Sequence, residues 1–292
     1  MSMPAVELPR LSTLMRLGRI SNIPTVWTNV LAGSVIAGGA PHPGRIMVIL
    51  FAMTAFYVGG MYLNDFFDRA IDARDRPGRP IDAGEIRAGT VSLLGFGLLG
   101  IGIVLMVTFG LGAMLWGTLL AVVIVLYDVW HKGNTLSPVV MGSCRALVYL
   151  GTGVAVSGGI SQATIIGAAA LASHVAGITY VAKQESLDRV GNLWPLLLLA
   201  APLLVALPAL FSGLTVIIAF ILLLGADAVA IRLLVKRPVP GAVPLAVSGL
   251  IAAICFVDAL AITLAGGDAL LAEICALGYP LTRHFQRSIP GT

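Results

Sequence analysis

The chain has 292 residues, of which 58% are hydrophobic and only 11% are charged. Typical soluble domains have roughly 45–50% and 25%, so a soluble fold would not bury this much apolar surface. The net charge of +4 is not gathered into a patch that would indicate nucleic-acid binding. Apolar stretches of about 20 residues match the length of a membrane-crossing helix, and no alternation of barrel strands appears. The composition therefore predicts an all-α integral membrane protein, a polytopic helical bundle.

The apolar stretches predict about nine transmembrane helices in a single domain over residues 1–292. In chain order, their expected bounds are 23–40, 46–66, 91–109, 111–129, 137–157, 161–182, 193–211, 213–233 and 242–266.

The basic residues predict the orientation of these helices. With the N-terminus in the cytoplasm, 14 of the 18 Lys and Arg residues fall in cytoplasmic segments, as the positive-inside rule requires. Arg45, Arg283 and Arg287 fall outside, and Arg145 lies within a span. We therefore expect an odd number of helices in a bacterial inner membrane, with the N-terminus cytoplasmic.

Acidic residues concentrate at the end of the second expected helix and in the loop after it. Four polar residues there recur at helical spacing and share one face: Asn64, Asp65, Asp68 and Asp72. Their mutual repulsion is removed by a hard divalent cation, and Mg²⁺ prefers a few carboxylates together with diphosphate oxygens. The alternative is a solvated helix end paired with neighbouring arginines.

Two further polar segments lie at the same expected membrane face. Glu185 and Asp188 are three residues apart at the end of the sixth helix, where they form either a second half of a metal site or an ordinary helix end. After the fourth helix, Lys132 is placed to neutralise a leaving diphosphate, and Tyr127 to line a cation path. The loop residue Arg79 either clamps phosphate or anchors the loop on the membrane.

Three ionisable residues lie deeper in the expected spans. Arg145 is costly in hydrocarbon, so we expect it to face a cavity or a carboxylate. Asp227 and Asp258 are its candidate structural partners. Four aromatic residues are candidates for an apolar cavity wall: Tyr62, Phe66, Tyr149 and Tyr180.

The motif Asn-Asp-x-x-Asp-x-x-x-Asp at 64–72, followed by Arg79-Pro80-Ile81, resembles the first signature of the UbiA superfamily of intramembrane prenyltransferases. The run from Asn22 to Trp27 is similar to the first helix of that family, where Arg19 and Asn22 would face the cavity. The resemblance implies about nine helices around a central cavity that opens to lipid. Two features depart from the family pattern. The second motif keeps two carboxylates where the family usually has three or more, and the run Met141 to Arg145 is closer to divergent members of the Ebo type.

The resemblance also implies the chemistry and the site. Mg²⁺ would bridge a prenyl diphosphate to the protein, and an aromatic or lipophilic acceptor would capture the allylic cation. The implied metal ligands are Asn64, Asp65, Asp68, Asp72, Glu185 and Asp188; the catalytic residues Asp65, Asp68 and Lys132; and the substrate-binding residues Arg19, Asn22, Asn64, Arg79, Tyr127 and Arg145. The alternatives are a scaffold that binds prenyl diphosphate without turnover and a secondary transporter, whose charges would lie near the bilayer midplane. The sequence does not determine prenyl chain length, the acceptor or the oligomeric state.

Overall fold

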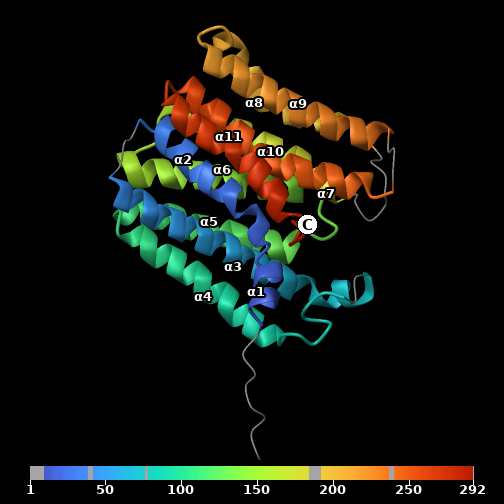
Figure 1. Cartoon of the computed structure of the whole chain (residues 1–292). Helices are drawn as coiled ribbons and strands as arrows, with labels where there is room; N and C mark the ends of the chain where they lie inside the picture. The colour runs from blue at the N-terminus through green and yellow to red at the C-terminus, as the bar shows by residue number, and fades with distance from the viewer. Residues whose placement is uncertain (1–9, 39–41, 76–77, 184–191, 237–239, 292) are drawn as a thin grey trace, which may run out of the picture.

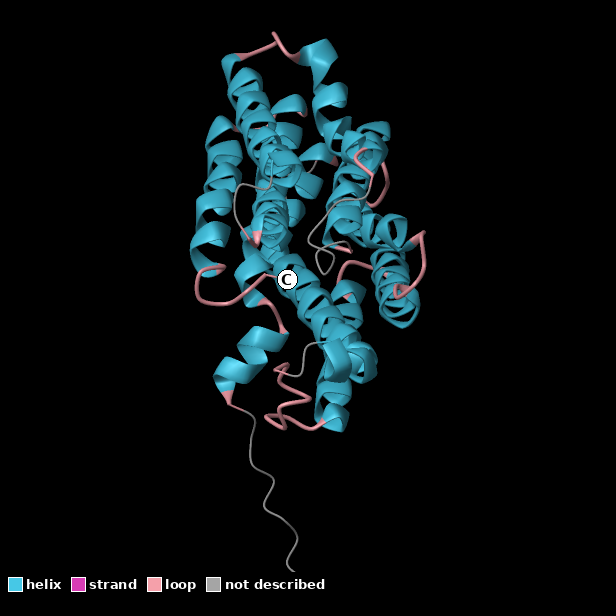
Figure 2. Ribbon diagram, turned by 90° about the vertical axis from the view of Figure 1, so that its right-hand side faces the viewer, coloured by secondary structure: helices cyan, strands magenta, loops and turns pink. Residues whose placement is uncertain are grey.

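The computed structural model describes residues 10–38, 42–75, 78–183, 192–236 and 240–291, and every regular element within them is helical (Figures 1 and 2). The elements are α1 (Leu11–Leu17), η1 (Ile20–Asn22), α2 (Ile23–Ile36), α3 (Pro43–Asp75), α4 (Ala88–Val107), α5 (Leu111–Trp130), α6 (Ser137–Ser157), α7 (Gln162–Ala182), η3 (Trp194–Ala200), α8 (Ala201–Ala206), η4 (Leu207–Ala209), α9 (Leu214–Lys236), α10 (Ala242–Leu264) and α11 (Ala269–Phe285). Seven of these helices are long and apolar enough to cross a membrane. The predicted helical membrane bundle is confirmed.

The bundle is built around two large apolar cores, and a third, smaller cluster joins α1 to α3 and α4. One core lies around α10 and takes residues from α7, α8, α9 and α11, and the other lies among α3, α4, α5 and α6. Helix α2 contributes Ala32 and Ile36 to the first core and Val26 and Val30 to the second. Figure 1 shows α2 and α6 between the two groups of helices. The candidate site lies in the part of the bundle that surrounds the second core, beside α2.

Small residues allow the closest helix contacts. A Cβ on Gly142 of α6 would lie 2.4 Å from the carbonyl oxygen of Ala172 on α7. A Cβ on Gly59 of α3 would lie 2.9 Å from the carbonyl oxygen of Gly95 on α4. Such contacts are typical of helices packed within a bilayer, where van der Waals packing replaces the hydrophobic effect between helices.

Helix α3 carries the acidic motif and is the longest element. Its 33 residues correspond to about 50 Å of helix, whereas the hydrocarbon core is about 30 Å thick. The helix is thus long enough to cross the bilayer and still extend its last turns past the apolar region. The motif lies in the second half of the helix, near that end.

The helix expected over 193–211 is present but shorter and irregular, since the residues from Trp194 to Ala209 are helical without being one α-helix. The segment is divided into η3, α8 and η4, and Pro195, Pro202 and Pro208 lie along it. Proline removes a backbone donor and disrupts the α-helical hydrogen-bond ladder. Pro202 has no N–H for the carbonyl of Leu198, which accepts instead from the backbone N–H of Ala201 and from the Ser173 hydroxyl on α7, the latter at 3.0 Å.

The predicted placement of the chain's end is wrong. Helix α11 was not expected; it turns back along α10, and Figure 1 shows the C-terminus near the start of α2. The Asn22 side chain donates to the carbonyl oxygen of Gly291 at 2.9 Å. Arg283 and Arg287 therefore lie at the end of the bundle that carries the acidic motif, and not at the opposite end. The prediction failed because α11 contains charged residues and Pro280, which weaken its hydropathy signal.

Candidate functional site

The four polar residues of the acidic motif are all buried on one face of α3. Arg79, from the loop after the helix, donates a hydrogen bond to Asp65 and lies 3.5 Å from Asp72. Arg19 donates to Asp65 and to Asn64, each at 3.3 Å. Two guanidinium groups from different segments thus meet the carboxylate of Asp65, and the motif is buried rather than solvated.

The backbone of Arg19 adopts a left-handed conformation with φ of 41°. This conformation costs about 1–2 kcal/mol for an L-residue other than glycine, and such strain often occurs at functional sites. The Tyr57 hydroxyl donates to the Arg19 carbonyl at 3.2 Å. The contact holds the strained residue against α3, with its guanidinium directed at the acidic motif.

Asp68 faces the end of α5. Its Oδ2 lies 3.3 Å from the Nε2 atom of His131 and 3.3 Å from the Nζ atom of Lys132. The His131 ring stacks on Tyr127, with centroids 4.8 Å apart. Lys132 is partly exposed, so its ammonium group is available to an anion arriving from solvent.

Two carboxylate oxygens of the site lack a hydrogen bond from the described residues. They are Oδ2 of Asp72, which has only the long ion pair with Arg79, and Oδ2 of Asp128, whose other oxygen accepts from Asn64 at 3.2 Å. A buried oxygen without a partner is costly, and oxygens of this kind are the ligands of hard divalent cations. No three Cys, His, Asp or Glu side chains of the described residues converge to hold a metal by themselves. The donor set therefore fits a cation that takes further ligands from a bound diphosphate.

The loop that carries Arg79 is tied to α1. Glu85 accepts hydrogen bonds from Arg16 and from Thr13, the latter at 2.6 Å. These donors lower the pKa of the Glu85 carboxyl below its usual value. The tie keeps the loop, and with it Arg79, over the end of α3.

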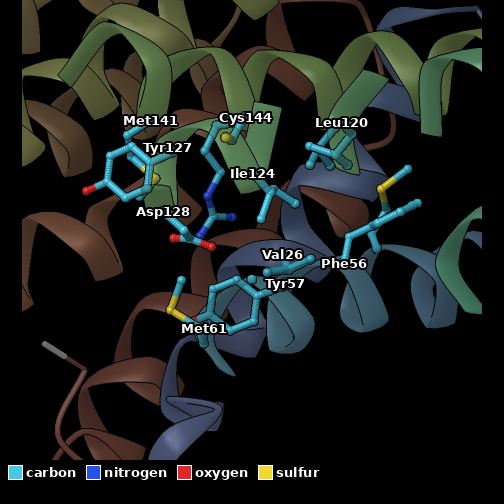
Figure 3. A pocket seen from close by; sticks show the side chains of 14 residues that line it. Val26, Phe56, Tyr57, Met61, Leu120, Ile124, Tyr127, Asp128, Met141 and Cys144 are labelled. Atoms are coloured by element: carbon cyan, nitrogen blue, oxygen red, sulfur yellow. The ribbon is translucent and has the colours of Figure 1, made fainter. Parts of the chain in front are cut away.

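A cavity of about 90 Å³ adjoins the acidic motif. Figure 3 shows Tyr127 and Asp128 towards one end of it and Leu120 and Phe56 towards the other, with the Tyr57 ring along the side. The remaining lining residues are mostly apolar and come from α2, α3, α5 and α6. The arrangement combines a charged end with an apolar interior.

Arg145 lines the cavity and is held by neutral oxygens. It donates to Oδ1 of Asn29 at 2.7 Å and to Oγ1 of Thr25 at 3.0 Å, and it lies 5.8 Å from the centroid of the Tyr57 ring. The amide group of Asn29 in turn donates to both oxygens of Asp258, at 2.7 and 2.8 Å. Asp258 is thus linked to Arg145 through Asn29, and the guanidinium keeps a charge not directly paired within the described residues.

The other expected partner of Arg145, Asp227, does not contact it. Asp227 lies on α9, with Oδ1 3.9 Å from Nε2 of His174 on α7. The two aspartates therefore occupy different environments in the same membrane bundle.

The model of the UbiA prenyltransferase family matches residues 25–243. The chain belongs to this family. A digeranylgeranylglyceryl phosphate synthase of Methanopyrus kandleri is 27% identical over 136 residues, which are 44% of this chain and 49% of that protein. One of Natronomonas pharaonis is 26% identical over 174 residues, which are 58% of this chain and 61% of that protein. In such matches the chain spans about half the length of the curated relatives.

Solved structures share the UbiA fold with this chain. A digeranylgeranylglyceryl phosphate synthase structure aligns with a TM-score of 0.63 at 21% identity, covering 87% of this chain and 98% of the other. A UbiA homologue from Archaeoglobus fulgidus, bound to DMAPP and Mg²⁺, aligns with a TM-score of 0.51 at 13% identity, covering 95% and 100%. At these identities the likeness shows the fold.

Several predicted positions of this UbiA-family chain differ from expectation. Asn22 does not line the described cavity; its amide group bonds the C-terminal segment, accepting from Gln286 at 3.0 Å. Glu185 and Asp188 lie outside the described residues. None of the four aromatic wall candidates lines the cavity: Tyr62, Phe66, Tyr149 and Tyr180. Tyr62, for example, bonds the Leu14 carbonyl of α1, because it points to the other side of α3.

Of the three aromatic residues that line the cavity, Tyr127 was predicted, whereas Phe56 and Tyr57 were missed although the sequence carries a signal for them. Tyr57, Met61 and Asn64 are three to four residues apart, so the face of α3 that carries the acidic motif continues into the cavity. Extending the helical spacing towards the N-terminus from Asn64 finds Gly60, Tyr57 and Met53. Phe56, four residues before Gly60, is found by the same spacing.

Proposed function

We propose that this chain catalyses Mg²⁺-dependent transfer of a prenyl group from a prenyl diphosphate to a lipophilic acceptor within the membrane. The observation that carries the proposal is the acidic face of α3, which is buried against arginines and lies next to residues of the same helix, Gly60 and Met61, that line a mostly apolar cavity. Membership of the UbiA prenyltransferase family and the relatives named as synthases support it. We further propose that residues 1–292 form one domain in a bacterial inner membrane, with the acidic end of the bundle in the cytoplasm.

Asn64, Asp65, Asp68 and Asp72 would hold the metal, together with Glu185 and Asp188. Bound Mg²⁺ would supply Lewis-acid neutralisation of the diphosphate charge. Its binding would compete with the ion pairs that Arg79 and Arg19 make with Asp65, so these guanidinium groups would turn to the phosphate oxygens, which they bind in bidentate fashion.

Residues of this chain would stabilise the two charges that form in the reaction, the negative charge on the departing diphosphate and the positive charge on the allylic cation. The allylic C–O bond breaks, the diphosphate leaves with the electron pair, and the acceptor nucleophile captures the cation and loses a proton. Lys132, 3.3 Å from Asp68, is placed to bind the departing diphosphate. Tyr57 and Tyr127 line the cavity, where their aromatic rings would stabilise a cation. The apolar lining excludes water, which would otherwise capture the cation.

Arg145 points to the class of acceptor. Its guanidinium faces the cavity and its described hydrogen-bond partners are neutral oxygens, so an anionic group on the acceptor would complete its pairing. The named relatives are synthases of a glyceryl phosphate lipid. A lipophilic acceptor that carries a phosphate or carboxylate therefore fits this site better than a neutral one.

The test is incubation of purified protein in lipid nanodiscs with a radiolabelled prenyl diphosphate and membrane-lipid extract, with and without Mg²⁺. Asp68→Asn should lose transfer while remaining folded, because Asp68 is both a proposed metal ligand and the contact of Lys132. Glu273→Gln is the matched control: it removes an exposed carboxylate on α11, away from the motif, and should keep full activity.

Other outcomes of this experiment would distinguish the enzyme from a binding scaffold and from a transporter. Mg²⁺-dependent binding of the diphosphate without product would identify a scaffold. Absence of any Mg²⁺-dependent binding would favour transport. Full activity of Asp68→Asn would remove the acidic motif from the mechanism.

A further inference from the structure

Arg145 is linked to a buried carboxylate through a single amide group. From α6, its Nη1 atom donates to Oδ1 of Asn29 on α2 at 2.7 Å. The Nδ2 atom of Asn29 donates in turn to both oxygens of Asp258 on α10, at 2.7 and 2.8 Å. Asn29 and Asp258 are fully buried. The three residues come from three helices, and the packing of α2 between α6 and α10 aligns them.

The carboxylate of Asp258 determines which way the Asn29 amide faces. An ionised carboxylate only accepts hydrogen bonds, so it takes the NH₂ group of Asn29 and leaves the amide oxygen directed at Arg145. The carboxylate is itself held by the hydroxyl groups of Thr28 at 2.5 Å and Tyr149 at 2.6 Å. The opposite amide orientation would set an NH₂ group against the guanidinium and an oxygen against the carboxylate. The buried charges therefore permit one orientation.

The interposed amide leaves the charge of Arg145 available to a ligand. Arg19 contacts the carboxylate of Asp65 directly, whereas no ion pair among the described residues includes Arg145. Its hydrogen bonds go to neutral oxygens of Asn29 and Thr25, and its side chain lines the cavity. A charge without a counter-charge is costly within a membrane bundle. An anionic group that enters the cavity would complete the pairing.

We propose that Asp258 is a positioning residue for the acceptor: by fixing the Asn29 amide, it keeps Arg145 aimed at the cavity and without a carboxylate partner, ready for the anionic group of the acceptor. This inference rests on the proposed function and adds to it two residues that do not line the described cavity.

A positioning role and a purely electrostatic role of Asp258 predict opposite results. If the charge of Asp258 acted on the ligand directly, its removal would strengthen anion binding, because like charges repel. If Asp258 orients Asn29, its removal weakens anion binding. The sign of the change therefore identifies the role.

The test compares decyl phosphate with decanol, two probes with the same tail. Their dissociation constants are measured by calorimetry on the chain in lipid nanodiscs, with EDTA present and the heats of empty nanodiscs subtracted. The wild-type chain should bind the phosphate about tenfold or more tightly than the alcohol, since a charge-assisted hydrogen bond changes affinity by about that factor. Arg145→Met should bind the two probes alike.

Asp258→Asn should lose most of this preference, because an asparagine both donates and accepts and so no longer selects one orientation of Asn29. An exchanged pair, Asn29→Asp together with Asp258→Asn, provides a second test if the single variant does not fold. The exchange keeps the net charge and the same hydrogen-bonding groups, but it sets a carboxylate directly against Arg145. It should also lose the preference, since the guanidinium is then paired within the protein.

Asp227→Asn is the matched control. It removes the same group from another buried position, on α9, that has no contact with Arg145. This variant should keep the wild-type preference.

Equal binding of the two probes by the wild-type chain, or an unchanged preference in Arg145→Met, would overturn the inference. An unchanged or stronger preference for the phosphate in folded Asp258→Asn or in the exchanged pair would overturn it as well. These measurements involve neither Mg²⁺ nor a prenyl diphosphate, so the proposed function would stand. It would fall only if the wild-type chain failed to bind a prenyl diphosphate in the presence of Mg²⁺.

Discussion

Asp258 and Asp227 lie inside neighbouring apolar helices and differ in what surrounds them. Asp258 accepts hydrogen bonds from three side chains: Thr28 at 2.5 Å, Tyr149 at 2.6 Å and Asn29 at 2.7 and 2.8 Å. Both oxygens of Asp227 lack a hydrogen bond from any described residue. The same substitution, Asp to Asn, should therefore destabilise the chain strongly at Asp258 and little or not at all at Asp227.

The magnitude for Asp258→Asn follows from its donors. An asparagine keeps one acceptor oxygen, but its NH₂ group would face the hydroxyl and amide donors that now bond to the second carboxylate oxygen. At least one charge-assisted hydrogen bond is therefore lost, and a second donor faces an NH₂ group to which it cannot donate. Hydrogen bonds to charged groups contribute about 1.5–3 kcal/mol each, and Arg145 loses the anion linked to it through Asn29. We expect a loss of about 3–5 kcal/mol in the free energy of unfolding, a large share of the usual 5–15 kcal/mol or so.

Asp227→Asn removes a buried carboxylate that no described donor stabilises, and we expect its effect to lie within about 1 kcal/mol of zero or to be stabilising. The measurement is the thermal unfolding midpoint of both variants in one detergent, followed by the loss of the monodisperse chromatographic peak. Asp258→Asn should unfold about 5–10 °C below the wild-type chain. Equal losses in the two variants would refute the reasoning, because hydrogen bonding would then not be what distinguishes the two sites.

Three further predictions concern topology, pH and metal. In a background without native cysteines, cysteines introduced at Gly78 and Ser288 should be protected from an impermeant reagent in intact cells, and one at Gly44 should be labelled. Ser288 should behave like Gly78 because the C-terminal segment lies at the acidic end of the bundle. Lowering the pH below about 4.5 should loosen the loop that carries Arg79, since the pKa of Glu85 is lowered in the folded state and its stabilisation is lost as that carboxylate protonates. Limited proteolysis of the loop measures this. Glu185→Gln should raise the Mg²⁺ concentration for half-maximal activity more than it lowers the saturated rate, because fewer anionic ligands weaken metal binding.

Each of these predictions has an outcome that contradicts it. If the cysteines at the Gly78 and Ser288 positions are labelled from opposite sides of the membrane, the C-terminal segment does not lie at the end of the bundle that carries the acidic motif. If proteolysis of the loop in Glu85→Gln depends on pH as it does in the wild-type chain, a group other than Glu85 causes the loosening at low pH. A metal requirement unaffected by Glu185→Gln would make that residue an ordinary helix end.

Features of the site that depend on neighbours along the chain could be predicted from the sequence. The spacing of Asn64, Asp65, Asp68 and Asp72 places them on one face of a helix, and the structure has them together on α3. The positions of the nine apolar segments agree with helical elements, although one segment is divided. These predictions succeeded because the period of a helix and the length needed to cross a bilayer are local properties.

Tertiary structure decided which residues meet. Arg19 reaches Asp65 from 46 positions away, and Asp128 reaches Asn64 from 64. The sequence offered Asp227 and Asp258 equally as partners of Arg145, and packing of α2 between α6 and α10 selected Asp258 by placing Asn29 between them. Tertiary contacts also determine the position of α11, since its packing against α2 and α10 brings Gly291 to Asn22. Helical periodicity sets the face on which a side chain lies, but the partner across that face belongs to a distant segment, and only the packing of the helices brings the two together.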